Sequence, residues 1–423
     1  MPISFLLQVR SRLLPLWLAA IFLAGLFPAP SWAADPIQLN SRGVELIRQG
    51  QFEQAVDLLE QAHRKVPSNR VVRDNLAVSY LGLGTRQIEA GRYEAAAETL
   101  RKGRTYAADD ARFWFLRGLA LFHLGRHQEA ESELNEARAI EEKPETLHLL
   151  GQVYYASGRL EQAIEVWREA LETGGWDEKL AALVDRTQEE LKVEQTMKNE
   201  VGSNFAISYD GRAHPELGGQ VLEVLETAYN DIGRELDFYP QVQVPVLLYT
   251  LRDFSELTGS PDWSGGLYDG KIRIPVGGVS AMNAQLRAVL YHEYVHVVVR
   301  YMTSGRCPVW LNEGLAEVAG RQHHDTPLDR LRRGLSGNKL IPFERLESSF
   351  ATLPSEQAEL AYQQSYSLVH YMLDQFHWYK MAELLRALGE GKSIAGAVDQ
   401  VLGEFAVDYA GLQAAWRRQA GVR

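Results

Sequence analysis

The chain has 423 residues, of which 46% are hydrophobic and 23% are charged, so it can form two or three packed domains and is not intrinsically disordered by composition. Its formal net charge of −11 argues against binding to nucleic-acid phosphates. Cys307 is the only cysteine, which excludes an intramolecular disulfide bond.

Residues 1–33 have the pattern of a signal peptide. Arg10 and Arg12 are their only charged residues, and the apolar run Leu16–Phe27 follows, with small residues at the expected cleavage point. This run is shorter than the roughly 20 residues that span a bilayer. We therefore expect an exported bacterial protein, periplasmic or secreted, without a stable membrane anchor after cleavage. A retained anchor is the alternative.

Four similar segments occupy residues 36–175. Each contains a glycine, a ring or leucine soon after it, and then an alanine. The alanines are separated by 41, 34 and 33 residues, at Ala55, Ala96, Ala130 and Ala163. Upstream in each segment a small residue recurs, at Gly43, Ala77, Gly118 and Gly151. In the last three segments a bulky residue follows it, at Tyr80, Leu121 and Tyr154.

A period near 34 residues with this pattern resembles the tetratricopeptide repeat family, whose unit is a pair of antiparallel helices. Small residues let the two helices approach closely, and bulky residues fill the space between units. The second repeat is longer by seven residues, which we place around residues 81–88 and which equal about two helical turns. We expect about four repeats in an all-α solenoid that binds a protein partner; a generic helical bundle is the alternative.

Residues 176–203 are polar and favour a helix. We expect a capping or linker helix that closes the solenoid and leads into the next domain. A fragment that begins near Trp176 should then fold without the repeats.

The pattern changes at residue 204. Three segments have the composition of strands and one has that of an amphipathic helix: strands at 205–210, 242–250 and 270–278, and a helix at 215–236. After Ala284 the chain favours helices. Residues 204–423 are therefore expected to form an α+β domain, which makes the chain a multidomain protein.

The segment Val289–Met302 is apolar on almost every side, yet it contains His292, Glu293 and His296. Histidines four residues apart share one face of a helix, so both can bind one Zn²⁺ at about 2.0–2.1 Å. Glu293 lies beside the pair and can reach a water molecule without binding the metal. This is the H-E-x-x-H arrangement. Two solvated surface histidines are the alternative, which the apolar neighbours disfavour.

A third ligand is available after a turn. Glu313 follows His296 by 17 residues and lies near the start of a predicted helix, so it can complete a His₂Glu site with an open position. Glu317, one helical turn later, can accept a hydrogen bond from a ligand histidine, and Asn312 can do the same. A metzincin would need histidine six residues after His296, where this chain has Met302.

The H-E-Y-V-H and W-L-N-E-G-L-A-E segments together resemble the gluzincin metallopeptidases, and more narrowly the peptidase MA-like proteins of bacteria. The resemblance covers roughly residues 204–423 and implies a zincin-like fold. It also implies Zn²⁺ held by His292, His296 and Glu313, with Glu293 as the general base.

Two further features carry the resemblance. Residues 265–278 are similar to the edge strand along which these enzymes align an extended peptide. Tyr362 resembles the tyrosine that stabilises the oxyanion in the aminopeptidase branch, and Tyr366 is the alternative. That branch holds the free amine of its substrate with a glutamate in the edge strand, whereas Asp269 is the only acid here. An endopeptidase is therefore favoured.

Three hypotheses about function remain. The first is a zinc-dependent peptidase that acts on a peptide or protein substrate and recruits a protein through its repeats. The second is a catalytically inactive scaffold with a metallopeptidase-like domain, and the third is a hydrolase of this fold that acts on another bond. The presence of His292, Glu293, His296 and Glu313 favours the first over the second.

Overall fold

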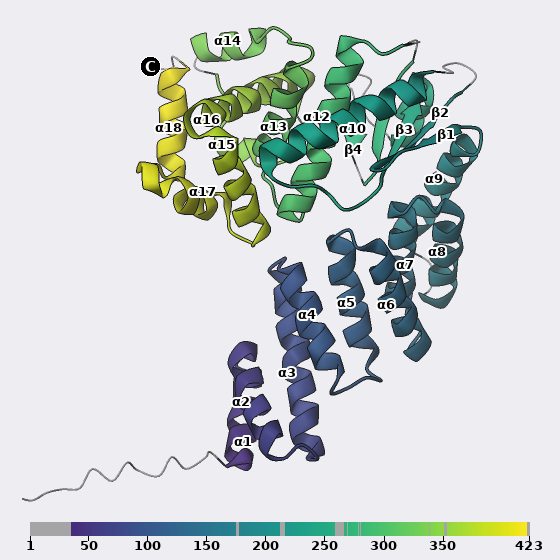
Figure 1. The fold of residues 1–423 in the computed structure, drawn as a ribbon, viewed down its shortest axis with the longest axis vertical. Coiled ribbons are helices and arrows are strands. Elements are labelled where there is room, and N and C mark those ends of the chain that lie inside the picture. Colours follow the sequence, from purple (N-terminus) through teal and green to yellow (C-terminus); the bar gives the residue numbers. More distant parts are fainter. Residues whose placement is uncertain are drawn as a thin grey trace, which may run out of the picture.

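The structure is a computed structural model, and it describes residues 35–174, 177–211, 216–258, 266–268, 270–277, 279, 281–337, 339–350 and 353–420. The N-terminal half is a stack of helices, and the C-terminal half combines one sheet with helices (Figure 1). The signal-peptide prediction for residues 1–33 lies outside the described residues, as do Trp176 and Asp269.

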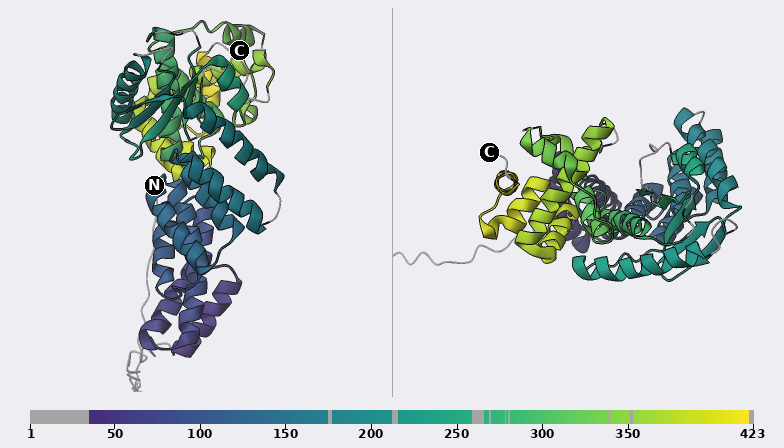
Figure 2. Two further views of the ribbon diagram at one scale, coloured as in Figure 1. Left: turned by 90° about the vertical axis from the view of Figure 1, so that its right-hand side faces the viewer. Right: turned by 90° about the horizontal axis from the view of Figure 1, so that it is seen from above.

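The helices of the N-terminal half form antiparallel pairs that stack into a column (Figure 1 and Figure 2). The pairs are α1 (Pro36–Arg48) with α2 (Phe52–Lys65), α3 (Arg70–Glu89) with α4 (Tyr93–Arg104), α5 (Ala111–His123) with α6 (His127–Ile140), and α7 (Pro144–Ala156) with α8 (Leu160–Gly174). Each pair turns at a glycine with a φ between 62° and 74°, a conformation that glycine adopts most readily: Gly50, Gly91, Gly125 and Gly158.

Three of the four predicted small residues lie where the two helices of a repeat are closest. A Cβ atom added to any of them would lie within 2.8 Å of a large side chain on the second helix; the pairs are Gly43 with Leu59, Gly118 with Leu134, and Gly151 with Trp167. In the second repeat this residue is Gly84, which packs on Leu100, and not Ala77. In each repeat the small residue lies seven positions before the turn glycine, as Gly84 does before Gly91. The seven extra residues of the second repeat therefore lengthen the start of α3, and the prediction that placed them around residues 81–88 is wrong.

The helix α9 (Glu178–Glu194) belongs to both halves of the protein. It begins at Asp177, whose carboxylate accepts a hydrogen bond from the Leu180 N–H at 2.9 Å. Leu180 and Val184 then pack into the hydrophobic core of the repeats. Val193, near the end of the helix, packs instead against residues of the sheet. One helix therefore connects the core of the repeats to a smaller apolar cluster on one face of the sheet.

The helix predicted within residues 176–203 ends at Glu194. Residues Lys198–Val201 form strand β1, which pairs antiparallel with β2 (Phe205–Tyr209). The Lys198 ammonium lies 5.5 Å from the centre of the Tyr209 ring. Pairing with a neighbouring strand therefore outweighs the helix propensity of this polar segment.

Within the described residues, the strands form one sheet in the order β1-β2-β3-β5-β4. β2, β3 (Val244–Tyr249) and β5 (Ile272–Pro275) are parallel, and β4 (Leu267–Tyr268) pairs antiparallel with β5 at the edge. Residues 265–278, which resembled one edge strand, therefore contain two strands, and only β4 lies at the edge. The short β4 depends on its pairing with β5, which the sequence alone does not reveal.

Different helices cover the two faces of the sheet. α10 (Leu217–Leu236) and α12 (Ala284–Thr303) pack on one face, where Ile272 and Ile274 of β5 enter the main core. α11 (Leu251–Thr258) and the end of α9 pack on the other face. Lys271 and Arg273 point to that second face, because side chains alternate along a strand.

The rest of the chain is helical, as the sequence predicted. The helices are α13 (Val309–Arg321), α14 (Asp329–Ser336), α15 (Phe343–Leu346), α16 (Ser355–Gly389), α17 (Ile394–Leu402), the short 3₁₀ helix η2 (Gly403–Phe405) and α18 (Tyr409–Gln419). None of the helices in the described ranges combines the length and apolar character needed to cross a membrane.

The turns of the repeats also reach the C-terminal half. The Arg306 guanidinium donates a hydrogen bond to the carbonyl of Ala90, in the turn after α3. The Tyr301 ring lies against Gly125 in the turn after α5, where an added Cβ atom would be 2.3 Å from the ring. The last turn of α12 is therefore in contact with the repeats.

Glu194 supplies a pH-dependent test of the packing between α9 and β5. Its carboxylate lies 3.2 Å from the Lys271 ammonium, and burial raises its pKa from 4.5 to about 7 despite that opposite charge. The folded chain thus holds this proton more tightly than the unfolded chain, so stability falls as pH rises from 4.5 to 7, by at most about 1.4 kcal/mol per pH unit. Thermal melting should show a smaller loss between pH 5 and 7 for Glu194→Gln than for the natural protein. Parallel curves would contradict this assignment.

Candidate metal centre

The helix α12 carries the motif that the sequence singled out. It begins after Asn283, whose side-chain oxygen accepts a hydrogen bond from the Leu286 N–H at 2.8 Å, and it ends at Ser304, with a φ of 52°. Most of its other side chains are buried in the main core. His292 and His296 lie on the face that lines a cavity.

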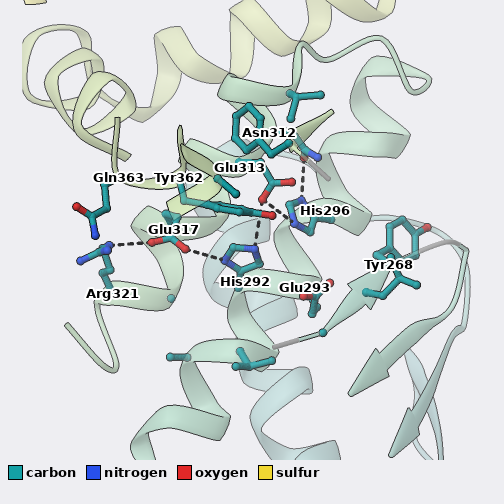
Figure 3. Close-up of a pocket in the computed structure, with 18 of the residues that line it drawn as sticks. Tyr268, His292, Glu293, His296, Asn312, Glu313, Glu317, Arg321, Tyr362 and Gln363 are labelled. Atoms are coloured by element: carbon teal, nitrogen blue, oxygen red, sulfur yellow. Dashed lines mark hydrogen bonds and ion pairs between the residues drawn. The ribbon is translucent and has the colours of Figure 1, made fainter. Parts of the chain in front are cut away.

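Three candidate metal ligands meet at this face. His292, His296 and Glu313 each offer a ligand atom, and these atoms lie within 4.8 Å of one another. Glu313 Oε2 is 3.5 Å from His292 Nε2 and 3.5 Å from His296 Nε2. Figure 3 shows the three side chains converging from α12 and α13. The three residues that the sequence proposed as ligands are therefore brought together.

Close helix packing places Glu313 in this position. The chain reverses after Ser304, and α13 then packs against both α12 and α16. A Cβ atom on Gly314 would lie 2.4 Å from Val369 of α16, and one on Gly320 would lie 3.1 Å from the Ala288 carbonyl oxygen of α12. Two residues without side chains thus let α13 lie close to both neighbours.

The remaining ring nitrogens face acceptors on α13. His296 Nδ1 lies 3.0 Å from Asn312 Oδ1, and His292 Nδ1 lies 3.6 Å from Glu317 Oε1. Protons on the two Nδ1 atoms leave the Nε2 lone pairs directed toward Glu313. The arrangement that the sequence suggested for Asn312 and Glu317 is thus present in the geometry.

The electrostatics of the cluster suit a cation. Burial alone would lower the pKa of His292, but the Glu313 contact and the charges of Glu293 and Glu317 raise it to about 9. Burial acts to raise the pKa of Glu313, yet the two histidines lower it overall. Among the described residues, Glu313 Oε2 lacks a hydrogen-bond partner. Two imidazoles and a buried carboxylate are a donor set that Zn²⁺ accepts, so the residues fit the metal.

Glu293 lies next to the ligands without joining them. Its side chain is 4% exposed, and burial raises its pKa. Within the described ranges Oε2 has no hydrogen-bond partner. The backbone at Gly266, just before β4, packs on the carboxylate, because an added Cβ atom would be 2.5 Å from Glu293 Oε1. A buried carboxyl with an open acceptor is suited to take up a proton.

A cavity of about 1120 Å³ surrounds the cluster. It follows α12 from Gln285 to Thr303, and Tyr268 of β4 forms part of its wall. This stretch of helix is about 27 Å long at 1.5 Å per residue. His292 and His296 lie near its middle, so there is room on both sides of them.

The two candidate tyrosines differ in position. Tyr362 lines the cavity, and Figure 3 shows its side chain extending toward His292 and Glu313. Burial, followed by the charge of Glu313, raises its pKa, so the phenol stays protonated and can donate a hydrogen bond. Tyr366 is absent from the residues that line the cavity; its ring lies 4.5 Å from the Arg321 guanidinium.

Arg321 was missed by the sequence analysis. Its Nε donates a hydrogen bond to Glu317 Oε2 at 2.9 Å, and its Nη1 donates to the Thr326 carbonyl at 2.6 Å. The side chain is buried, so it holds one oxygen of Glu317 while the other faces His292. Its position four residues after Glu317 on the same helix was the available signal.

Known protein families match both halves of the chain. The model of the Peptidase MA superfamily matches residues 236–421, and three tetratricopeptide-repeat models match residues 40–61, 81–144 and 144–173. No protein with curated annotation matches the chain.

Solved structures match part of the chain. A thermophilic tetratricopeptide-repeat protein of Thermus thermophilus is 24% identical, with 37% of this chain and 82% of that chain covered and a TM-score of 0.25. A crystal structure of MamA is 21% identical, with 36% and 86% covered and a TM-score of 0.31.

The family matches confirm the resemblance and the fold class predicted from the sequence. The repeats fill the N-terminal half, and the mixed sheet and helices lie in the C-terminal half. The C-terminal half of this chain matches the Peptidase MA superfamily, and this match follows a series of matches to tetratricopeptide repeats.

Proposed function

We propose that this protein is an exported zinc-dependent metallopeptidase that cleaves peptide bonds within protein chains and uses its repeats to bind a protein partner. The observation that carries the proposal is the cluster of half-buried His292, His296 and Glu313 beside Glu293 in one cavity. The family match to the Peptidase MA superfamily supports a peptidase-like activity. The signal-peptide pattern of residues 1–33 supports export to the periplasm or beyond.

His292, His296 and Glu313 would hold the zinc ion, and Asn312 and Glu317 would orient the two imidazoles. Zinc, when bound, supplies Lewis-acid chemistry that polarises the substrate carbonyl and activates water. Lowering of the pKa of Glu313 keeps this carboxylate charged for the metal. The ligand set therefore depends on side chains from two adjacent helices.

Glu293 is the proposed general base. Its carboxylate lines the cavity and has an acceptor atom without a hydrogen-bond partner among the described residues, so it can take a proton from the attacking water and deliver it to the leaving amine. Tyr362 is the proposed oxyanion donor, because its protonated phenol reaches the same region (Figure 3).

The shape of the cavity favours cleavage within a chain. It continues along α12 in both directions from the ligands, from Gln285 at one end to Thr303 at the other. A substrate can therefore occupy both sides of the scissile bond. β4, at the edge of the sheet, supplies backbone groups beside this path.

Cleavage of an unfolded protein tests the proposal. The zinc-loaded protein should hydrolyse a denatured substrate, lose activity with a chelator, and regain it with added zinc. Mass spectrometry of the products should show internal fragments. A zinc-loaded protein that leaves unfolded substrates intact would instead favour the inactive scaffold.

Arg321→Gln should weaken zinc binding although Arg321 is not a ligand. Without the guanidinium, Glu317 is free to turn away from His292, so the imidazole is held less well. We expect zinc affinity to fall by roughly tenfold, at the lower end of the effects seen for groups behind metal ligands. Competition with a chromogenic chelator measures the change. Arg332→Gln, which removes an exposed ion pair with Asp329, is the control and should keep the natural affinity.

A further inference from the structure

Buried charges connect α9 to the sheet on the face opposite the main core. The Lys271 ammonium donates a hydrogen bond to Glu190 Oε1 at 2.7 Å, and Arg273 Nη2 donates to the same oxygen at 2.9 Å. All three side chains are buried: Lys271 is 1% exposed, Arg273 is 2% exposed and Glu190 is 3% exposed. Burial acts to raise the pKa of Glu190, but the two cations lower it to about 2. Glu190 is therefore charged at physiological pH.

The last repeat takes part in the same network. The Tyr155 hydroxyl of α7 donates a hydrogen bond to Glu190 Oε2 at 2.8 Å and accepts one from Arg273 Nη2 at 2.7 Å. On the other side, Arg273 Nη1 donates to the Tyr249 hydroxyl of β3 at 2.8 Å. The network therefore joins a repeat helix, α9, β3 and β5, and Tyr155 is its partly exposed member on the repeat side. These contacts argue against the expectation that a fragment beginning near Trp176 folds alone. Such a fragment would lack Tyr155, and it would expose the side of α9 that packs on the repeats.

β5 transmits this anchoring to the cavity. Arg273 is paired with Leu267 of β4, and the neighbouring Ile272 is paired with Tyr268. Leu267 and Tyr268 both line the cavity. The residue before them, Gly266, packs on the carboxylate of Glu293. A short path thus leads from the last repeat through two paired strands to the proposed general base.

We propose that Glu190 and Tyr155 are positioning residues that hold β5, and through it the edge strand β4, at the distance from Glu293 that an extended substrate requires. Both act through the strands and touch no reacting atom. The last repeat and α9 then form part of the substrate-binding structure instead of a separate recruiting module. This inference rests on the proposed function for its substrate, whereas the anchoring of β5 stands on the contacts alone.

The chemistry of the network favours positioning over a general gain in stability. A buried ion pair is on average no more stabilising than apolar groups of the same shape, but removal of one partner leaves its charges unpaired. Loss of the Glu190 charge would leave Arg273 beside a neutral amide in a dry setting, whereas Lys271 would keep the Glu194 carboxylate at 3.2 Å. Arg273 lies on β5 and Lys271 immediately precedes it, so the disturbance falls on that strand first.

The test compares Glu190→Gln and Tyr155→Phe with a matched control, Glu133→Gln. Glu133 is also a buried carboxylate between two cations, since Arg104 donates to it at 2.9 Å and Arg117 pairs with its other oxygen. All of these lie within the repeats. Each full-length, zinc-loaded variant is analysed by hydrogen exchange of the β4 and β5 amides, by zinc content, and by steady-state cleavage of one peptide.

In Glu190→Gln we expect β5 amides to exchange roughly tenfold faster, because local opening becomes easier, while the exchange rates of α13 stay the same. KM should rise by roughly tenfold with kcat changed by less than about threefold, since the strands bind substrate away from the reacting bond. Tyr155→Phe should show a smaller change in the same direction. Glu133→Gln should accelerate exchange in α5 and α6 and leave both β5 and KM as in the natural protein.

The inference would be overturned if the β5 amides of Glu190→Gln exchanged at the rate of the natural protein. It would also be overturned if Glu133→Gln accelerated exchange at β5 as much as Glu190→Gln does. Faster exchange at β5 with an unchanged KM would overturn the link to substrate. If Glu190→Gln does not fold, Tyr155→Phe decides by the same two readouts, because it removes one hydroxyl and little volume. If the natural protein cleaves no peptide, the proposed function fails, and the exchange data alone decide whether Glu190 and Tyr155 anchor β5.

Discussion

Glu293→Gln should retain about one zinc ion per chain and lose peptidase turnover by roughly 10²–10⁴-fold, the contribution of a positioned acid–base group. The amide has nearly the same shape as the carboxylate, so the packing against Gly266 survives. It cannot accept the proton of the attacking water. Metal analysis and steady-state kinetics on the same preparation measure the two quantities separately.

Glu313→Gln provides the contrast. Here the substitution replaces an anionic ligand 3.5 Å from both imidazole Nε2 atoms with a weaker, neutral one. Zinc content should fall, and activity should return in part when zinc is added in excess. A zinc-free Glu293→Gln protein beside a zinc-loaded Glu313→Gln protein would mean that the two glutamates have been assigned the wrong roles.

Tyr362→Phe should reduce kcat by roughly 10²–10³-fold, as loss of one oxyanion donor does in comparable sites. The hydroxyl contacts the substrate oxygen strongly only when negative charge develops on it, so KM should change little. The ring would remain packed edge-on against Phe350, with centroids 5.3 Å apart. Zinc content and the melting temperature should therefore be unaffected, and the loss can be assigned to catalysis.

Tyr366→Phe is the matched control for that variant. Tyr366 lies one helical turn later on α16, outside the cavity lining, with its ring beside Arg321. Its removal should leave kcat and KM near their natural values. If Tyr362→Phe kept the natural kcat and Tyr366→Phe lost it, the oxyanion role would belong to Tyr366. If both variants kept the natural kcat, neither tyrosine would take part in the mechanism.

The features that the sequence predicted best are those with a fixed spacing. The repeats were found because helix packing requires a small residue and a turn glycine at the same place in each unit. The three candidate ligands were found because histidines four residues apart must share a helix face, and a short turn returns Glu313 to them. Even so, the spacing misplaced the extra residues of the second repeat, because Ala77 fits the period while Gly84 makes the contact.

The features that the sequence did not predict depend on contacts between distant segments. β1 and β4 are short, and each exists through pairing with a neighbour. Lys271 and Arg273 alternate with isoleucines, a pattern typical of a strand with one solvated face. Their partner Glu190 lies 81 residues before Lys271, and no local signal marks it. The alternation was recognisable, but the identity of the covering helix was not.

X-ray absorption at the zinc edge of the purified protein tests the central claim most directly. The proposed centre predicts nitrogen and oxygen neighbours at about 2.0–2.2 Å, with two imidazoles among them and one position left for solvent. His296→Ala should remove one imidazole from the spectrum. A sulfur neighbour at about 2.3 Å would assign Cys307 to the metal, and four protein ligands without solvent would indicate a structural site. Either result would contradict a catalytic centre built from His292, His296 and Glu313.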